Sequence, residues 1–161
     1  MPERLIDTNI LVYAYDTSEG TKHTIAKELL KQIWQDGGGV VCVQNLMEFF
    51  VVITKKVASP IPLADAKTII DDMVRSESWR VIDRDINTFL QAIDLVSQYA
   101  VHIWDATIAA CMKENGVMHI VTEDKADFEK IQDIQVIFPF ERTKLLSFDS
   151  ETYFQTRNTG I

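Results

Sequence analysis

The stretch RLIDTNILVY, residues 4–13, passes from an apolar strand through an acid into a helical pattern, and it decides the fold. Arg4 to Asp7 is a short apolar run of the kind that forms a buried strand. Asp7 ends this run, and it also stands where a helix N-cap would serve the segment from Asn9 to Tyr15. Ligands of open α/β sheets bind at the carboxyl ends of the strands, so Asp7 is the first candidate site residue.

The rest of the chain repeats this alternation of strand and helix. Apolar, β-branched runs predict strands at 4–7, 40–43, 80–83, 119–122 and 135–138. Stripes with helical spacing separate them, and the clearest consists of Ile86, Phe89, Leu90, Ile93 and Val96. Alternating strands and helices imply parallel strands joined by helical crossovers. We therefore predict a three-layer α/β/α sandwich with a mainly parallel five-stranded sheet and a ligand crevice at one edge.

Length and composition limit the classes of protein that the chain can represent. With 161 residues, 47% of them apolar, it fits one domain, which we place at 1–140, with 141–161 as an extension of that domain or a tail. The formal net charge of −8 argues against nonspecific coating of DNA by the whole surface. The apolar runs are too short to span a bilayer and no signal peptide precedes them, so we expect a cytoplasmic protein. Cys42 and Cys111 lie in apolar surroundings and are expected to be buried thiols.

Four acids, Asp7, Glu48, Asp105 and Asp124, each stand at the end of a predicted strand or the start of a predicted helix. Carboxylates gathered within a few ångströms repel one another and raise one another's pKa, so a fold keeps such a group only where a cation or a reaction needs it. Carboxylate oxygens are the ligands that Mg²⁺ and Mn²⁺ prefer. The set therefore predicts a divalent-metal site, with one or two ions.

Each acid also has a purely structural interpretation. Glu48 stands three residues after Asn45, which is the spacing of a capping box. Asp105 could complement a helix dipole, although its apolar neighbours suggest burial, where an unpaired acid is costly. Asp124 could be a solvated loop acid, as we expect Asp127 to be. We leave His102 out of the site, because no second histidine at helical spacing supports a zinc ligand.

Four motifs resemble those of the PIN-domain ribonucleases, and most closely the VapC-type toxins. They are LIDTNILVYA at 5–14, Glu48 in an apolar helix, WDATIAA at 104–110, and VTEDK at 121–125 followed by Asp127 and Phe128. The resemblance covers nearly the whole chain, and it implies a PIN-like fold in which Asp7, Glu48, Asp105 and Asp124 bind Mg²⁺ or Mn²⁺ and cut RNA. It assigns supporting roles to Asn9, Thr122 and Asp127. Because Asp127 comes three residues after Asp124 instead of two, either of them could be the closer ligand.

The resemblance and the chemistry also suggest partners. A small antitoxin would place its C-terminal segment in the acidic cleft, with an Arg near the carboxylates. The run FFVVI at 49–53 is apolar all round a helix, which predicts a homodimer. Lys55, Lys56 and Lys125 lie near the acids in the sequence and are candidates for contacts with RNA. The alternative is a catalytically silent PIN scaffold that binds RNA or protein, whereas a phosphatase of the aspartyl-phosphate type would need a D-x-D start that Asp7-Thr8-Asn9 lacks.

Overall fold

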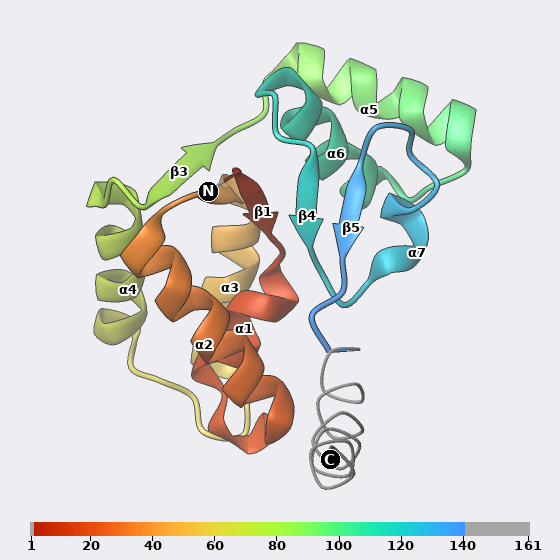
Figure 1. Ribbon diagram of the computed structural model, residues 1–161. Helices are drawn as coiled ribbons and strands as arrows, with labels where there is room; N and C mark the ends of the chain where they lie inside the picture. The colour runs from red at the N-terminus through yellow and green to blue at the C-terminus, as the bar shows by residue number, and fades with distance from the viewer. Residues whose placement is uncertain (1, 141–161) are drawn as a thin grey trace, which may run out of the picture.

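The computed structural model describes residues 2–140, so the expected extension at 141–161 lies outside the described residues. Its centre is a five-stranded parallel sheet in the order β3-β2-β1-β4-β5 (Figure 1). Each predicted strand is present, with ends within one residue of those predicted. The strands are β1 (Arg4–Ile6), β2 (Gly39–Cys42), β3 (Trp79–Ile82), β4 (His119–Val121) and β5 (Gln135–Ile137).

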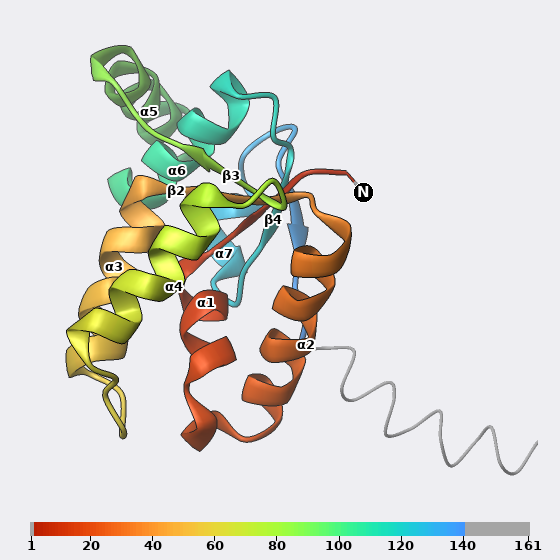
Figure 2. The same ribbon diagram turned by 90° about the vertical axis from the view of Figure 1, so that its left-hand side faces the viewer.

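Helices cover both faces of this sheet, as Figures 1 and 2 show. Four helices pack on one face and three on the other, which confirms the predicted three layers. On the first face lie α1 (Thr8–Tyr15), the 3-10 turn η1 (Thr17–Glu19), α2 (Thr21–Asp36), α3 (Val43–Lys55) and α4 (Leu63–Arg75). On the second face lie α5 (Ile86–Tyr99), α6 (Ile103–Glu114) and α7 (Lys125–Phe128).

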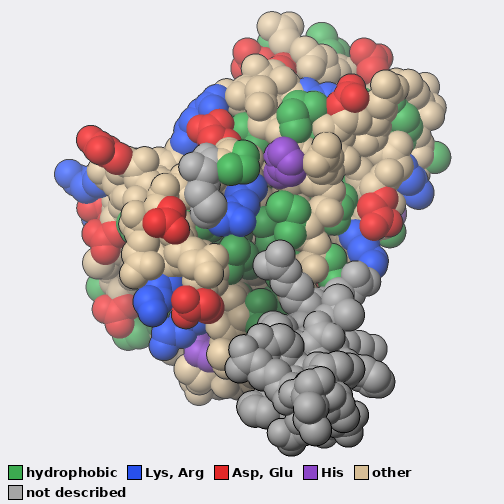
Figure 3. Space-filling view, in the orientation of Figure 1, with side chains coloured by type: hydrophobic (Ala, Val, Ile, Leu, Met, Phe, Trp, Pro, Cys, Tyr) green, Lys and Arg blue, Asp and Glu red, His purple; other side chains and the backbone are tan. Residues whose placement is uncertain are grey.

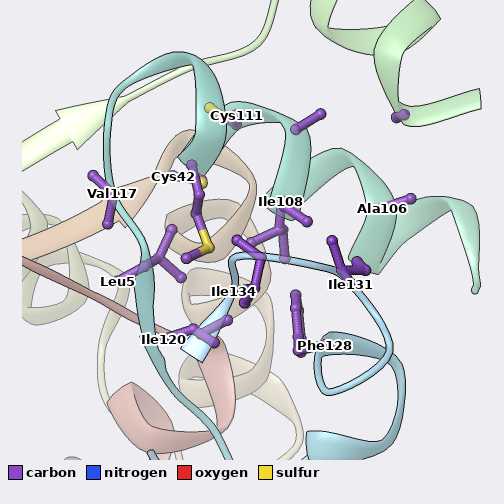
Figure 4. Packing of buried hydrophobic residues seen from close by; sticks show 14 of the residues in the cluster. Leu5, Cys42, Ala106, Ile108, Cys111, Val117, Ile120, Phe128, Ile131 and Ile134 are labelled. Atoms are coloured by element: carbon purple, nitrogen blue, oxygen red, sulfur yellow. The ribbon is translucent and has the colours of Figure 1, made fainter. Parts of the chain in front are cut away.

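Successive residues of each strand point to opposite faces, so the two helical layers have separate cores. Ile6 and Val121 pack against the layer of α1 to α4. Leu5 and Ile120, which are paired across β1 and β4, pack against α6 and α7 (Figure 4). Both faces of the central strands β1, β2 and β4 are largely buried, so these strands are mostly apolar, which is why they stood out in the sequence.

Glycines at 37–39 end α2 and begin β2. Gly37 has a φ of 78°, a left-handed conformation that favours glycine at the end of a helix. Gly39 begins β2 at a place where a Cβ atom would lie 2.6 Å from Ile33 Cγ2 and 2.6 Å from Trp79 Cε3. Glycine therefore allows β2 to lie directly beneath α2 and beside β3.

The apolar stripe of α5 lies mainly on the outside of the protein. Ile86 and Leu90 are 68% and 54% exposed, and Phe89 and Ile93 are exposed as well. The helix turns smaller residues such as Ala92 inward, toward α6. This apolar outer face has no partner among the described residues of the chain.

The structure also shows how the charged side chains are distributed and where the two cysteines lie. Acidic and basic side chains are interspersed on the face seen in Figure 3, so the negative net charge is not gathered there. Cys42 and Cys111 are both buried, as predicted, and lie beside one another in Figure 4. Within residues 2–140, none of the helices combines the length and apolar character that a membrane span requires.

Candidate metal centre

Asp7 lies where β1 ends and α1 begins. Its Oδ1 accepts a hydrogen bond from the backbone N–H of Thr8 at 2.8 Å, so the residue is an N-cap as well as a candidate ligand. Asn45 Nδ2 donates to the same oxygen at 3.3 Å, and Thr122 Oγ1 donates to Oδ2 at 2.7 Å. Burial raises the pKa of Asp7, and the charges of Asp124 and Glu48 add to the rise against these hydrogen bonds. Hydrogen bonds thus fix the carboxylate of Asp7 in position, while burial and the neighbouring acids disfavour its ionised form.

Glu48 comes from the second turn of α3 and is exposed, yet both of its oxygens are held. Gln44 Nε2 donates to Oε1, and Thr8 Oγ1 donates to Oε2, each at 3.2 Å. The alternative interpretation of Glu48, a capping box with Asn45, does not hold, because α3 begins at Val43. Cys42 is the N-cap residue, and its backbone N–H donates to Asn45 Oδ1 at 3.0 Å. Glu48 is therefore free of any capping role.

Asp105 stands in the first turn of α6, as predicted, and is half-buried. Burial, followed by the charges of Asp7, Asp127 and Asp124, raises its pKa to about 7, with a hydrogen bond to Asp127 adding to the rise. A carboxylate at such a position is strongly disfavoured until a cation balances it.

Asp124 follows β4 and is exposed. Its backbone N–H donates to Thr122 Oγ1 at 3.0 Å, and its Oδ2 accepts from Asn9 Nδ2 at 3.3 Å. The hydroxyl of Thr122 thus joins Asp124 to Asp7, and Asn9 approaches Asp124 from α1. Asn9 and Thr122, two of the three supporting residues that the resemblance suggested, therefore lie beside Asp7 and Asp124 and form hydrogen bonds with them.

The four acids line one pocket of about 460 Å³ at the carboxyl ends of the strands. They come from four separate parts of the chain, and the fold brings them together; their role as metal ligands stays a prediction. The other residues that line the pocket are Thr8, Asn9, Val12, Tyr13, Gln44, Val52, Trp104 and Ile108. None of these described lining residues is a Lys, an Arg or a His.

This donor set fits Mg²⁺ or Mn²⁺. All four acids offer carboxylate oxygens, which hard divalent ions prefer, and the pocket has room for the waters that such ions retain. Because no basic side chain of residues 2–140 lines the pocket, the described lining leaves the charge of the acids unbalanced. A bound cation would supply the balance and would lower the raised pKa values of Asp7 and Asp105.

Asp127 was expected to be a solvated loop acid, and that expectation is wrong. It is buried in α7, where its Oδ2 accepts the backbone N–H of His102 at 2.9 Å and lies 2.6 Å from His102 Nδ1. Burial alone would raise its pKa, but these contacts and the nearby charge of Lys130 hold the pKa of Asp127 below its ordinary value. Asp127 does not line the four-acid pocket.

His102 was not predicted to be a site residue, but it lies next to Asp105 and Asp127. One ring nitrogen of His102 and one carboxylate oxygen from each of Asp105 and Asp127 lie within 4.8 Å of one another. The spacing in the sequence could have indicated that the two residues are close, because His102 stands three residues before Asp105, about one helical turn away.

None of the three basic residues proposed for RNA contacts lines the pocket. Lys56 lines a neighbouring hollow of about 410 Å³ that also contains Glu48. Lys125 Nζ is 4.7 Å from the centre of the Phe138 ring, a cation–π distance. Lys55 is exposed on the last turn of α3.

Comparison with solved structures shows that proteins of this fold are known. A toxin-antitoxin complex from Klebsiella pneumoniae matches with a TM-score of 0.61 and 20% identity, over 85% of this chain and 98% of the matched chain. VapC20 from Mycobacterium tuberculosis, a Sarcin-Ricin loop cleaving toxin, matches with a TM-score of 0.60 and 16% identity, over 78% and 92%. VapBC2 from Rickettsia felis, bound to a DNA fragment from its promoter, matches with a TM-score of 0.58 and 16% identity, over 83% and 96%.

At this level of identity the similarity shows the fold. No curated protein sequence matches the chain. The family model described as PIN domain matches residues 4–134, a range that includes every strand except the last and all four acids of the pocket. The chain therefore belongs to the PIN domain family.

Proposed function

We propose that this protein is an endoribonuclease that depends on a divalent metal ion, Mg²⁺ or Mn²⁺, and cleaves RNA phosphodiester bonds. One observation carries the proposal: four acids from separate segments line a single pocket that contains no basic side chain among its described lining residues. A phosphodiester is itself anionic, so it can enter such a pocket only with a cation. The family to which the chain belongs and its toxin-like fold support the same activity.

In this proposal, Asp7 and Asp105 are the principal metal ligands, and Asp124 and Glu48 bind directly or through water. The ion, when bound, would activate a water molecule and balance the charge of the phosphate. Hydrogen bonds from Thr122 to Asp7 and from Thr8 to Glu48 hold these carboxylates without contributing charge. The chain thus supplies a set of fixed oxygen donors that is ready before the ion arrives.

We further propose that the protein is the toxin of a type II toxin-antitoxin pair and acts in the cytoplasm. The acidic pocket would accept an Arg from a small antitoxin, because a guanidinium can pair with two carboxylate oxygens at once. Solved structures of similar fold include toxin-antitoxin complexes. Co-purification from the native operon tests this point, and recovery of no small partner would contradict it.

We also propose that the protein forms a homodimer. Phe49 and Ile53 are fully buried in the core of their own chain, so they need no second chain to cover them. The exposed apolar face of α5, which includes Phe89 and Leu90, now carries the proposal. Light scattering should give a dimer for the wild type and a monomer for Leu90→Asp; a wild-type monomer at every concentration would contradict it.

A cleavage assay tests the proposed function against its alternatives. With Mg²⁺, the protein should cut RNA and should leave duplex DNA and a small phosphate ester intact. EDTA should stop the reaction, and Asp105→Asn should abolish it while the far-ultraviolet circular dichroism stays unchanged. If the wild type cuts none of the three substrates but binds RNA, the silent-scaffold alternative holds. If Asp105→Asn cuts RNA at the wild-type rate, the assigned site is wrong.

A further inference from the structure

Trp104 stands on the rim of the four-acid pocket with most of its ring in solvent. The chain has three tryptophans, of which Trp79 is buried and Trp34 is partly buried, with its ring centroid 5.8 Å from that of Trp79. Trp104, in contrast, is 65% exposed. The large apolar area of an indole ring contributes to stability or binding only where something covers it. Its exposure beside the pocket therefore points to an occupant that would cover it.

Two hollows share Trp104 in their lining. One is the four-acid pocket, and the other is a neighbouring hollow of about 710 Å³ between the starts of α5 and α6. Successive residues of an α-helix are rotated by about 100°. The ring of Trp104 can therefore extend toward α5 while the carboxylate of Asp105 lies among the acids. A ligand that leaves the first pocket toward the second would pass over the indole ring.

The second hollow holds a basic side chain, which the described lining of the first pocket lacks. Arg84 is exposed and lines this hollow together with Trp104. Its Nη1 donates a hydrogen bond to Gln44 Oε1 at 3.4 Å, and Gln44 lines the four-acid pocket, so the guanidinium stands between the two. The acid of the hollow, Asp85, is the N-cap of α5 and accepts hydrogen bonds there. An aromatic face and a positive charge are thus available in one hollow.

We propose that Trp104 stacks on the base of an unpaired nucleotide next to the scissile phosphate, and that Arg84 contacts a neighbouring phosphate of the same strand. The inference rests on the proposed function in so far as it places the scissile phosphate among the four acids. A nucleotide offers both parts that the hollow accepts, a π-face for the indole ring and a phosphate for the guanidinium. Bases inside a duplex are already stacked and paired, so the substrate would be a single strand or an unpaired loop of RNA.

A second copy of the chain is the competing occupant. Ile86 and Phe89 belong both to the hollow and to the exposed apolar face of α5 that carries the proposed homodimer. Leu90 and Ile93 lie on that face but do not line the hollow. Trp104 comes from α6 and also lines the acidic pocket. This continuity with the pocket favours the nucleotide, because a partner held at α5 does not account for it.

Fluorescence titration with a short oligoadenylate RNA tests the stacking, with Ca²⁺ as the ion that binds the carboxylate oxygens. A stacked base should quench the emission of Trp104 in the wild type. Trp104→Phe should lose the quenching and keep the dissociation constant within about threefold, because a phenyl ring also stacks. Trp104→Ala should raise the dissociation constant about tenfold, as measured by the anisotropy of labelled RNA. Leu63→Ala is the matched control, because it removes a similarly exposed apolar side chain from the start of α4.

An abasic RNA of the same length separates stacking from charge. The wild type should bind the abasic RNA about tenfold more weakly than oligoadenylate. Trp104→Ala should bind the two RNAs equally, because the missing ring has no base to contact. Arg84→Gln should weaken the binding of both RNAs to the same extent, and it should reduce the slope of log K against log salt by about one.

Three results would overturn the proposal. The first is that the wild type binds neither RNA, and the second is that Trp104→Ala binds oligoadenylate as tightly as the wild type or loses the same factor on the abasic RNA. The third is that Trp104→Ala is a monomer where the wild type is a dimer, which would assign the ring to the interface between copies. Cleavage of RNA by the wild type with Mg²⁺ would still support the nuclease in each case. Conversely, base-dependent binding through Trp104 without cleavage would uphold the stacking position and overturn the nuclease.

Discussion

Replacement of Asp105 by Asn should stabilise the metal-free protein, and the gain should grow with pH. The surroundings raise the pKa of Asp105 from 3.8 to about 7, mainly through burial and the nearby carboxylates. An acid whose pKa rises on folding holds its proton more tightly in the folded state, so the wild type loses stability between about pH 4 and pH 7 and carries the full cost above pH 7. Asn has nearly the same shape, carries no charge and avoids this cost.

The expected size follows from the same pKa. At 1.36 kcal/mol per pKa unit, a rise from 3.8 to about 7 corresponds to about 4 kcal/mol as an upper value. Water reaches the half-buried side chain and screens the repulsion, so we expect about 2 kcal/mol. For a chain of this length, that gain raises the melting temperature by about 4 to 8 °C.

Thermal melts in EDTA at about pH 5 and about pH 8 measure this effect. The gap between Asp105→Asn and the wild type should be small at the lower pH and full at the higher one, and Asp94→Asn, on the exposed side of α5, should show neither effect. Mg²⁺ at 100 times its dissociation constant should stabilise the wild type by about 2.7 kcal/mol and the variant much less. Two results would refute the convergence of the acids: a melting temperature of Asp105→Asn below that of the wild type at pH 8, or a difference in melting temperature that is the same at both pH values. Asp7 is a poorer choice, because it also caps α1.

Four further substitutions have distinct expected results. Asp124→Asn should abolish Mg²⁺-dependent RNA cleavage with little effect on the melting temperature. Asp127→Asn should lower the free energy of unfolding by about 1.5 to 3 kcal/mol, because its buried carboxylate accepts hydrogen bonds. If Asp127→Asn reduces cleavage more than Asp124→Asn does, the roles of the two acids are exchanged. Thr122→Val should weaken Mg²⁺ binding in calorimetry, since it removes a donor to a buried carboxylate of the pocket; unchanged affinity would contradict this. Gly39→Ala should destabilise the protein by about 1 to 3 kcal/mol in urea unfolding, since the added methyl group meets two neighbouring side chains, and a neutral result would mean that they yield.

Local pattern was enough to predict the sheet and the convergence of the acids. Strands buried on both faces appear as continuous apolar runs, so their positions could be predicted to within one residue. In a parallel sheet, the residues that follow the strands gather at one edge, which is why Asp7 and Asp124 could be placed together before any distance was known.

Features that depend on packing between distant segments could not be predicted. Asp127 was expected in solvent, but the start of α6 covers it, and this contact joins residues 25 positions apart. The helix that bears Glu48 begins at Val43 because Cys42 and Asn45 form the cap, a role that the residue type of Cys42 does not suggest. The outward apolar face of α5 shows that helical spacing identifies a stripe without showing which partner covers it.

Cleavage of RNA in H₂¹⁸O with Mg²⁺, followed by mass spectrometry of the products, tests the central claim most directly. If a metal-activated water attacks the phosphate, one ¹⁸O atom enters the phosphate end of each cut, no 2′,3′-cyclic phosphate forms, and Asp105→Asn gives no product. Cyclic phosphate ends without ¹⁸O, formed equally well in EDTA, would show that the RNA 2′-hydroxyl is the nucleophile and that the four acids do not hold the ion that cuts.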